Sequence, residues 1–242
     1  MLETAVALVF AHALADFVLQ TDRMVREKHR APMLLAHGAI VAATAWAALG
    51  LPLTPWPVLA VTLTHVLVDW LKVRFGGAGF RAFALDQAAH LAVIVAVAVV
   101  WPGTYAAGLW PEAGLLAAPL THLPMAFAFA AGLIGAVWAG GHAVGALMRG
   151  LKLPSDPAGD PSLPQGGRLI GQLERLLILV LVLAGEIVGI GLLIAAKSIL
   201  RFGEAQRSRQ TAEYVIVGTL ASFAWALIVA IATAAAISVL RP

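Results

Sequence analysis

The residues of this sequence that are best suited to chemistry are histidines and aspartates inside apolar runs. In AHALADF, His12 precedes Asp16 by four residues, and in THVLVDW, His65 precedes Asp69 by the same four. Residues four apart lie on one face of an α-helix, so each pair should point in one direction. The two stretches share the pattern small–His–x–Leu–x–Asp–aromatic at an offset of 53 residues, which indicates a duplicated unit.

The same offset aligns two further histidines. His37 maps onto His90, and the first and second histidines of each copy are separated by 25 residues. We therefore predict that residues 1–102 contain two helical hairpins related as a parallel repeat, an arrangement known in transporters. Asp86 precedes His90 by four residues but aligns with Met33, so the site should be asymmetric.

Neutral imidazole and carboxylate are the protein ligands of zinc, manganese and iron. The predicted cofactor is therefore a divalent metal, zinc first, with manganese or iron as alternatives. The predicted metal ligands are His12, Asp16, His37, His65, Asp69 and His90. Asp86 would be a further ligand or, as the catalytic residue, a general base for water. Two other readings stay open, because buried ionisable groups also form proton or ion pathways and His–Asp pairs also hold helices together.

Membrane helices must position these residues. The chain has 242 residues, of which 61% are hydrophobic and 12% charged, and its mean hydropathy is +0.90. Soluble domains carry about 25% charged residues, so the composition predicts an all-α, polytopic membrane bundle of about 6–7 spans. Apolar segments long enough to cross a bilayer are expected over residues 3–20, 31–50, 56–74, 84–102, 123–148, 169–200 and 211–240. Without cysteine, the chain has neither disulfides nor thiolate metal sites.

The segment 169–200 is longer than one span requires. It is either a tilted helix of about 48 Å or a segment broken near GEIVGIG, and we favour the broken form. Only the broken form would bring Glu174 and Lys197 together. The expected organisation has four parts: a duplicated two-helix repeat (1–102), an external loop with the fifth span (103–150), a cytoplasmic linker rich in Pro and Gly (151–167), and a C-terminal helical membrane segment (168–242).

Basic loops set the expected orientation, because short cytoplasmic loops are rich in Lys and Arg. Loops 21–30, 72–81 and 149–168 are basic and should be cytoplasmic, which places the N-terminus outside, although the stretch 201–209 is basic as well. At 1.5 Å per residue, His12 and Asp16 lie about 12 and 6 Å from the cytoplasmic end of their span. The predicted substrate-binding residues near this face are Gln20, Arg23, Arg26, Lys72, Arg74 and Gln87. The net charge of +3 indicates contact with the lipid bilayer and with anionic lipid, not with nucleic acid.

Several motifs in order carry a resemblance: AHALADFVLQTD, LLAHGAI, THVLVDWLK, LDQAAH, and further on GRLIGQLERLLI, AAKSILRF and AEYVIVGTL. They resemble a bacterial inner-membrane family described as domain of unknown function 3307, over about the first hundred residues and separately over 168–222. The resemblance implies a multi-pass protein of the bacterial inner (cytoplasmic) membrane. It also implies that Gln87 and the His and Asp residues above are important, without naming a reaction. The same residues are loosely similar to those of membrane-bound metal-dependent hydrolases.

Three functions fit these observations. The first is an integral membrane metal-dependent hydrolase that acts on a lipid-linked or amphipathic substrate near the cytoplasmic face. The second is a metal-ion or proton transporter or channel that uses the same His and Asp residues. The third is a non-catalytic structural or signalling membrane protein. No oligomeric state follows from the sequence.

Overall fold

The computed structural model describes residues 1–111, 120–151, 165–205 and 209–241. Within these ranges the chain is helical and contains no strand, which confirms the predicted all-α class for this part of the protein. Five helical stretches are long and apolar enough to cross a membrane: Leu2–Leu19, Ala31–Ala48, Phe80–Val100, Leu123–Met148 and Ala212–Leu240. Each coincides with a predicted span.

The other two predicted spans differ from these five. Residues 56–74 form helix α4 (Trp56–Phe75), whose last turns are charged and which is not among the five stretches. The segment 169–200 is broken into α9 (Gly166–Leu183) and α10 (Ile187–Ala205). Gly185 lies between them with φ +79°, a conformation that glycine adopts without steric cost. The broken form is thus confirmed, and the total number of spans stays a prediction.

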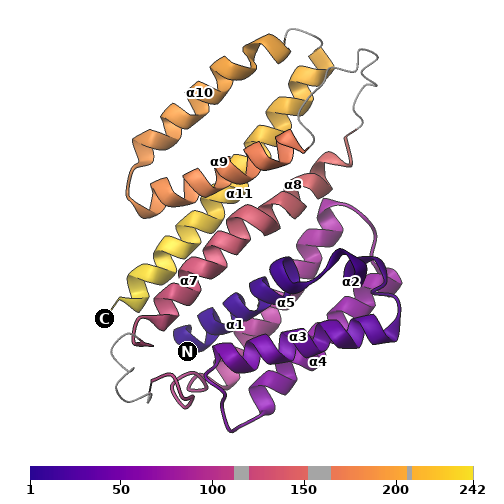
Figure 1. The fold of residues 1–242 in the computed structure, drawn as a ribbon, viewed down its shortest axis with the longest axis vertical. Coiled ribbons are helices and arrows are strands. Elements are labelled where there is room, and N and C mark those ends of the chain that lie inside the picture. The colour runs from indigo at the N-terminus through magenta and orange to yellow at the C-terminus, as the bar shows by residue number, and fades with distance from the viewer. Residues whose placement is uncertain (112–119, 152–164, 206–208, 242) are drawn as a thin grey trace. The chain divides into compact units, whose positions relative to one another are not determined.

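The chain divides into two compact units. The first comprises residues 1–134 and 235–242, and the second comprises residues 135–234. Figure 1 shows the helices of both units by colour along the chain. Most of the predicted linker 151–167, and part of the predicted external loop, lie outside the described residues. The four-part organisation therefore stays a prediction.

The first unit is built around the N-terminal helix. Its elements are α1 (Leu2–Leu14), the π-helical turn η1 (Ala15–Leu19), α2 (Asp22–Arg26), α3 (Ala31–Ala48), α4, α5 (Phe80–Val100) and α7 (Leu123–Ile134). α1 contacts α3, α5 and α7, while α4 contacts both α3 and α5. The helices α1, α3, α4 and α5 therefore form a closed ring, and α7 covers the outside of α1.

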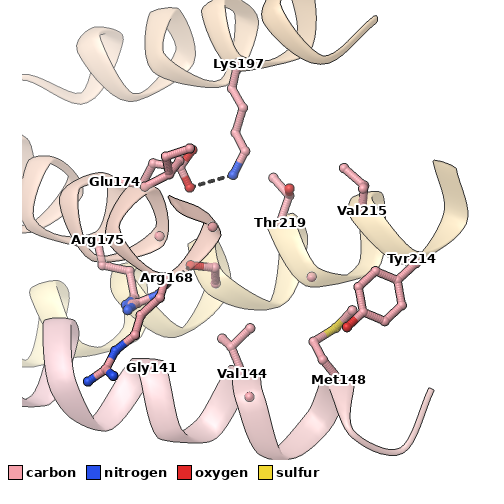
Figure 2. A pocket seen from close by; sticks show the side chains of 16 residues that line it. Gly141, Val144, Met148, Arg168, Glu174, Arg175, Lys197, Tyr214, Val215 and Thr219 are labelled. Atoms are coloured by element: carbon pink, nitrogen blue, oxygen red, sulfur yellow. Dashed lines mark hydrogen bonds and ion pairs between the residues drawn. The ribbon is translucent and has the colours of Figure 1, made fainter. Parts of the chain in front are cut away.

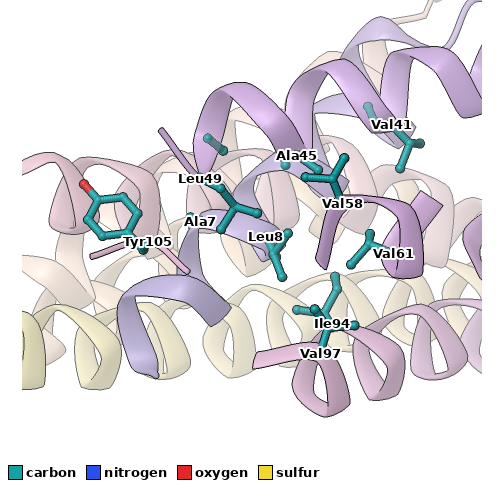
Figure 3. Packing of buried hydrophobic residues seen from close by; sticks show 13 residues of the cluster. Ala7, Leu8, Val41, Ala45, Leu49, Val58, Val61, Ile94, Val97 and Tyr105 are labelled. Atoms are coloured by element: carbon teal, nitrogen blue, oxygen red, sulfur yellow. The ribbon is translucent and has the colours of Figure 1, made fainter. Parts of the chain in front are cut away.

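Small and branched apolar residues fill one part of this ring (Figure 3). Leu8 of α1, Val58 and Val61 of α4, and Ile94 and Val97 of α5 point toward one another there, and all are buried. Alanines of α1 and α3 belong to the same cluster, which lets the helix backbones approach closely. This packing fixes the rotation of each helix about its own axis, and so fixes which other side chains face inward.

Hydrogen bonds join the start of α1 to the loop that follows α5. Thr4 Oγ1 donates a hydrogen bond to the carbonyl oxygen of Pro102 over 3.0 Å and accepts one from the backbone N–H of Tyr105 over 3.2 Å. Burial, followed by the nearby charge of Glu3, raises the pKa of Tyr105 to about 12. The loop after α5 is thereby tied to the first turn of α1.

In the second unit, a buried arginine lies at the centre of the packing. The π-helical turn η3 (Gly135–Ala139) precedes α8 (Gly140–Met148), and α9, α10 and most of α11 (Arg209–Leu240) pack beside them. Arg175 of α9 donates to the carbonyl oxygens of Ala136 and Val137, both over 2.9 Å, and to Ser222 Oγ over 3.1 Å. These bonds supply partners for backbone oxygens of the π turn, where the regular helical bonding changes.

Candidate metal centre

Seven ionisable side chains from all four helices of the ring form one connected group, which we call the His/Asp cluster. Its members are His12, Asp16, His37, His65, Asp69, Asp86 and His90. All seven side chains are buried, and the Asp16 side chain is 8% exposed. The structure therefore brings together all six predicted metal ligands and the predicted catalytic residue.

The cluster continues the buried faces that form the apolar core. On α5, the inward stripe contains Asp86 and His90 and then Ile94, at a spacing of four residues. On α4, Val61 is followed by His65 and Asp69 at the same spacing. Because helix faces repeat at three and four residues, each stripe changes from apolar to polar along its length, and the polar parts meet.

The turn η1 sets the position of Asp16. Its π-helical hydrogen bonds run from residue i to i+5, so side chains after His12 are rotated relative to those of a regular helix. The His12 Nδ1–Asp16 Oδ1 distance is 3.8 Å, whereas Asp16 Oδ1 lies 3.2 Å from His37 Nε2 on α3 and 3.4 Å from His65 Nε2 on α4. The Asp16 carboxylate therefore faces the neighbouring helices more closely than its own.

Three of these atoms form a small triangle. The third side, from His37 Nε2 to His65 Nε2, measures 3.0 Å. Ligand atoms around a tetrahedral zinc ion with bonds of about 2.0–2.1 Å are about 3.3–3.4 Å apart. The sides of the triangle, 3.0, 3.2 and 3.4 Å, come close to this separation. We call Asp16, His37 and His65 the His₂Asp triad.

Charge balance separates Asp16 from the other two carboxylates of the cluster. Lys28 Nζ lies 2.6 Å from Asp69 Oδ2, and Lys72 Nζ donates to Asp86 Oδ2 over 2.6 Å. Among the described residues, neither a lysine nor an arginine pairs with Asp16, whose Oδ1 faces imidazole nitrogens alone. A buried carboxylate without a cationic partner is costly, and a bound cation would remove that cost.

The Asp69 carboxylate lies beside the triad. Its Oδ2 is 3.5 Å from His65 Nε2 and 3.7 Å from His37 Nε2, while the same oxygen pairs with Lys28. Lys28 is 13% exposed and reaches inward from the short segment after α2. In the sequence, Lys28 is one of several basic residues of loop 21–30. A loop has no helical periodicity, so the sequence did not predict the direction of this long side chain.

Two further sets of three side chains could each hold a metal ion: His12, His65 and His90, and Asp69, Asp86 and His90. The first shares His65 with the triad, and the two share His90. The rings of His65 and His90 stack with centroids 4.1 Å apart. The three sets therefore adjoin one another through shared imidazoles.

The six predicted substrate-binding residues fall into three groups. Gln87 and Lys72 touch the cluster, since Gln87 Oε1 accepts from His12 Nε2 over 3.2 Å and its Nε2 donates to Asp86 Oδ2 over 3.1 Å. Arg23, Arg26 and Arg74 are exposed instead, and Arg23 pairs with Glu27 over 3.4 Å. The remaining residue, Gln20, is half-buried at the end of η1.

The family match found for this chain lies within the first unit. Residues 5–111 match the family described as "Protein of unknown function (DUF3307)". This range contains the whole His/Asp cluster, together with Lys28 and Lys72. No curated protein and no solved structure matches the chain, so the similarity to membrane-bound metal-dependent hydrolases stays a prediction.

Proposed function

We propose that the first unit is a membrane metal centre that hydrolyses a lipid-linked or amphipathic substrate, with a zinc ion held by the His₂Asp triad. The observation that carries this proposal is the triangle of Asp16 Oδ1, His37 Nε2 and His65 Nε2, with sides of 3.0–3.4 Å. Two imidazoles and one carboxylate also match the ligand sets of known catalytic zinc and non-haem iron sites. Manganese or iron could take the same ligands.

The triad uses three protein ligands, which is the number found in catalytic zinc sites. When bound, zinc would supply a Lewis acid and an activated water. Asp69 is the carboxylate beside the triad. Its ion pair with Lys28 would keep it ionised, and an ionised carboxylate can accept a proton from water. Asp86 is the second candidate base, and it contacts His90 and Lys72.

Several features support an amphipathic substrate. Exposed arginines surround the end of the ring that carries the cluster, among them Arg23 and Arg26 on α2 and Arg74 near the end of α4. Guanidinium groups bind phosphate with two hydrogen bonds, while the helix surfaces around them are apolar. A substrate with a phosphate-bearing head and an acyl or isoprenoid chain fits this combination.

The placement of the unit in the cell is part of the same proposal. The basic segments 21–30 and 72–81 support a cytoplasmic position for the cluster, an external N-terminus, and residence in the bacterial inner membrane. The offset of 53 residues supports a parallel repeat in which α1 with α3 corresponds to α4 with α5. The corresponding residues would be His12 and His65, Asp16 and Asp69, and His37 and His90.

Transport of a metal ion or a proton is the second candidate. Its support is the sharing of His65 and His90 among three adjoining ligand sets, because a row of weak sites lets an ion move from one to the next. In this case zinc would cross the membrane of reconstituted vesicles, and no ester would be cleaved.

Reconstitution with metal tests the proposed function. The purified protein is stripped with a chelator and assayed with p-nitrophenyl carboxyl and phosphate esters of increasing chain length, with and without added zinc. We expect hydrolysis only with zinc, a preference for longer chains, and loss of hydrolysis in Asp16→Asn. Bound zinc with zinc flux and no hydrolysis would support transport, and absence of bound metal would leave packing as the role of the cluster.

A further inference from the structure

The second unit contains a cavity that takes no part in the proposed metal chemistry. Its volume is about 490 Å³, within the range of small-molecule sites. The cavity is lined by α8, α9, α10 and α11, and Figure 2 shows Lys197 of α10 reaching toward Glu174 of α9 while Val144 and Met148 of α8 form the opposite wall.

The charges that line the cavity are mostly positive. The cavity lining contains three cationic side chains, Arg168, Arg175 and Lys197, and a single carboxylate, Glu174. The Lys197 Nζ–Glu174 Oε2 distance is 2.5 Å, and both side chains are largely buried. The ammonium group has three N–H donors, so pairing with Glu174 leaves Lys197 able to donate to a second anion.

Arg175 adds a fixed positive charge. The residue is 3% exposed, and its guanidinium is held by two backbone oxygens of η3 and by Ser222. A Cβ on Gly140 would lie 2.8 Å from Arg175 Cδ, so glycine at this position makes room for the side chain. Five guanidinium N–H groups are available in all, and the described bonds use three of them.

The cavity lies at the ends of two helical stretches that could cross a membrane. Met148 is the last residue of Leu123–Met148, and Tyr214 is close to the beginning of Ala212–Leu240. Tyrosine is common at the level of lipid head groups. The remaining lining is apolar, including Ile170 and Val215, and glycines of α8 leave space for a chain beside them.

We propose that this cavity binds the phosphate head group of an anionic lipid. The phosphate would accept hydrogen bonds from Lys197 and Arg168, while Arg175 supplies fixed charge behind them, and the first part of an acyl chain would lie along the apolar wall of α8. The site is separate from the His/Asp cluster in residues and in chemistry, so its test does not depend on metal.

Binding of short-chain lipids tests the head group. The purified full-length protein in detergent is titrated calorimetrically with dihexanoyl phosphatidylglycerol, dihexanoyl phosphatidylcholine and inorganic phosphate. We expect the anionic lipid to bind about tenfold more tightly than the zwitterionic one, because both carry the phosphate but only the zwitterionic lipid brings a choline cation toward the positive charges of the cavity. It should also bind more tightly than inorganic phosphate, which has no acyl chain. Equal affinity for the two lipids would overturn the proposal, as would inorganic phosphate binding as tightly as the anionic lipid.

Two substitutions that break the same ion pair separate binding from stability. Lys197→Gln should weaken binding of the anionic lipid about tenfold, and Glu174→Gln should strengthen it about threefold, because the lysine loses its competing carboxylate. A purely structural ion pair would make the affinity for the anionic lipid change in the same direction in both variants.

Gly145→Leu is an independent variant. A Cβ there meets only ordinary contact, 3.7 Å from Arg149 Nη1, and the larger side chain would enter the cavity. It should reduce lipid binding at least about tenfold without lowering the thermal midpoint, and unchanged binding in this variant would contradict the proposed location.

Discussion

Replacement of His65 by alanine is the most informative perturbation of the proposed metal centre. His65 Nε2 forms two sides of the triangle, at 3.0 Å from His37 Nε2 and 3.4 Å from Asp16 Oδ1. Loss of a group that only orients a metal ligand typically costs 10–100-fold in affinity. Loss of a ligand itself should therefore cost more than about 100-fold, or about 2.7 kcal/mol at 1.36 kcal/mol per tenfold change.

His12→Ala is the matched control. His12 is also a buried histidine of the cluster, 5% exposed, and its ring centroid lies 5.6 Å from that of His65, but it is not part of the triad. Zinc affinity is measured by competition with a chromogenic chelator, and the thermal midpoint of the metal-free protein reports on folding in both variants. We expect His65→Ala to lose zinc and His12→Ala to keep it within about threefold. Equal losses in the two variants, at similar thermal midpoints, would refute the assignment of the triad.

Three further predictions concern helix spacing, charge and pH. A Cβ on Gly38 would lie 2.7 Å from the side chain of Val66. Gly38→Val should therefore separate α3 from α4 and weaken zinc binding at least about tenfold. Gly77→Val is the control, because a Cβ there meets no atom within 4 Å, and it should leave zinc binding unchanged. Lys28→Met leaves the buried Asp69 carboxylate without its lysine, so it should lower the thermal midpoint of the metal-free protein. Added zinc should then raise the midpoint of this variant by more than it raises that of the wild type. In a Tyr214→Phe variant, the ultraviolet titration of the remaining tyrosine, Tyr105, should have its midpoint at about 12. Because the raised pKa belongs to the folded state, the stability from this tyrosine is fully present below pH of about 10 and is lost as the pH rises toward 12. Unchanged zinc affinity in Gly38→Val would contradict the first prediction, and a raised thermal midpoint in Lys28→Met would contradict the second. A titration midpoint of Tyr105 near pH 10 would contradict the third.

Helical periodicity predicted much of the geometry around the cluster. The spacing of four residues between His65 and Asp69, and between Asp86 and His90, is retained on regular helices, and both pairs face the interior. The break of segment 169–200 also follows from local chemistry, because a glycine with positive φ ends α9. Backbone rules of this kind depend on residues close together in the chain, which is why the sequence alone carries them.

The remaining features depend on side chains and on local irregularity. The π-helical turn that directs Asp16 toward α3 and α4 has no marker in ADFVL, which contains neither glycine nor proline. The inward direction of Lys28 depends on several rotatable bonds and on a carboxylate from another helix. For the same reason, the sequence predicted six ligands without singling out Asp16, His37 and His65 as a set whose atoms lie 3.0–3.4 Å apart.

X-ray absorption at the zinc edge tests the central claim most directly. The protein is purified without affinity metal, supplied with zinc, and freed of excess. The triad predicts about one zinc ion per chain, with a first shell of two imidazole nitrogens and at least one oxygen at about 2.0–2.1 Å. A protein that takes up no zinc, or a bound zinc whose shell lacks imidazole, would contradict it.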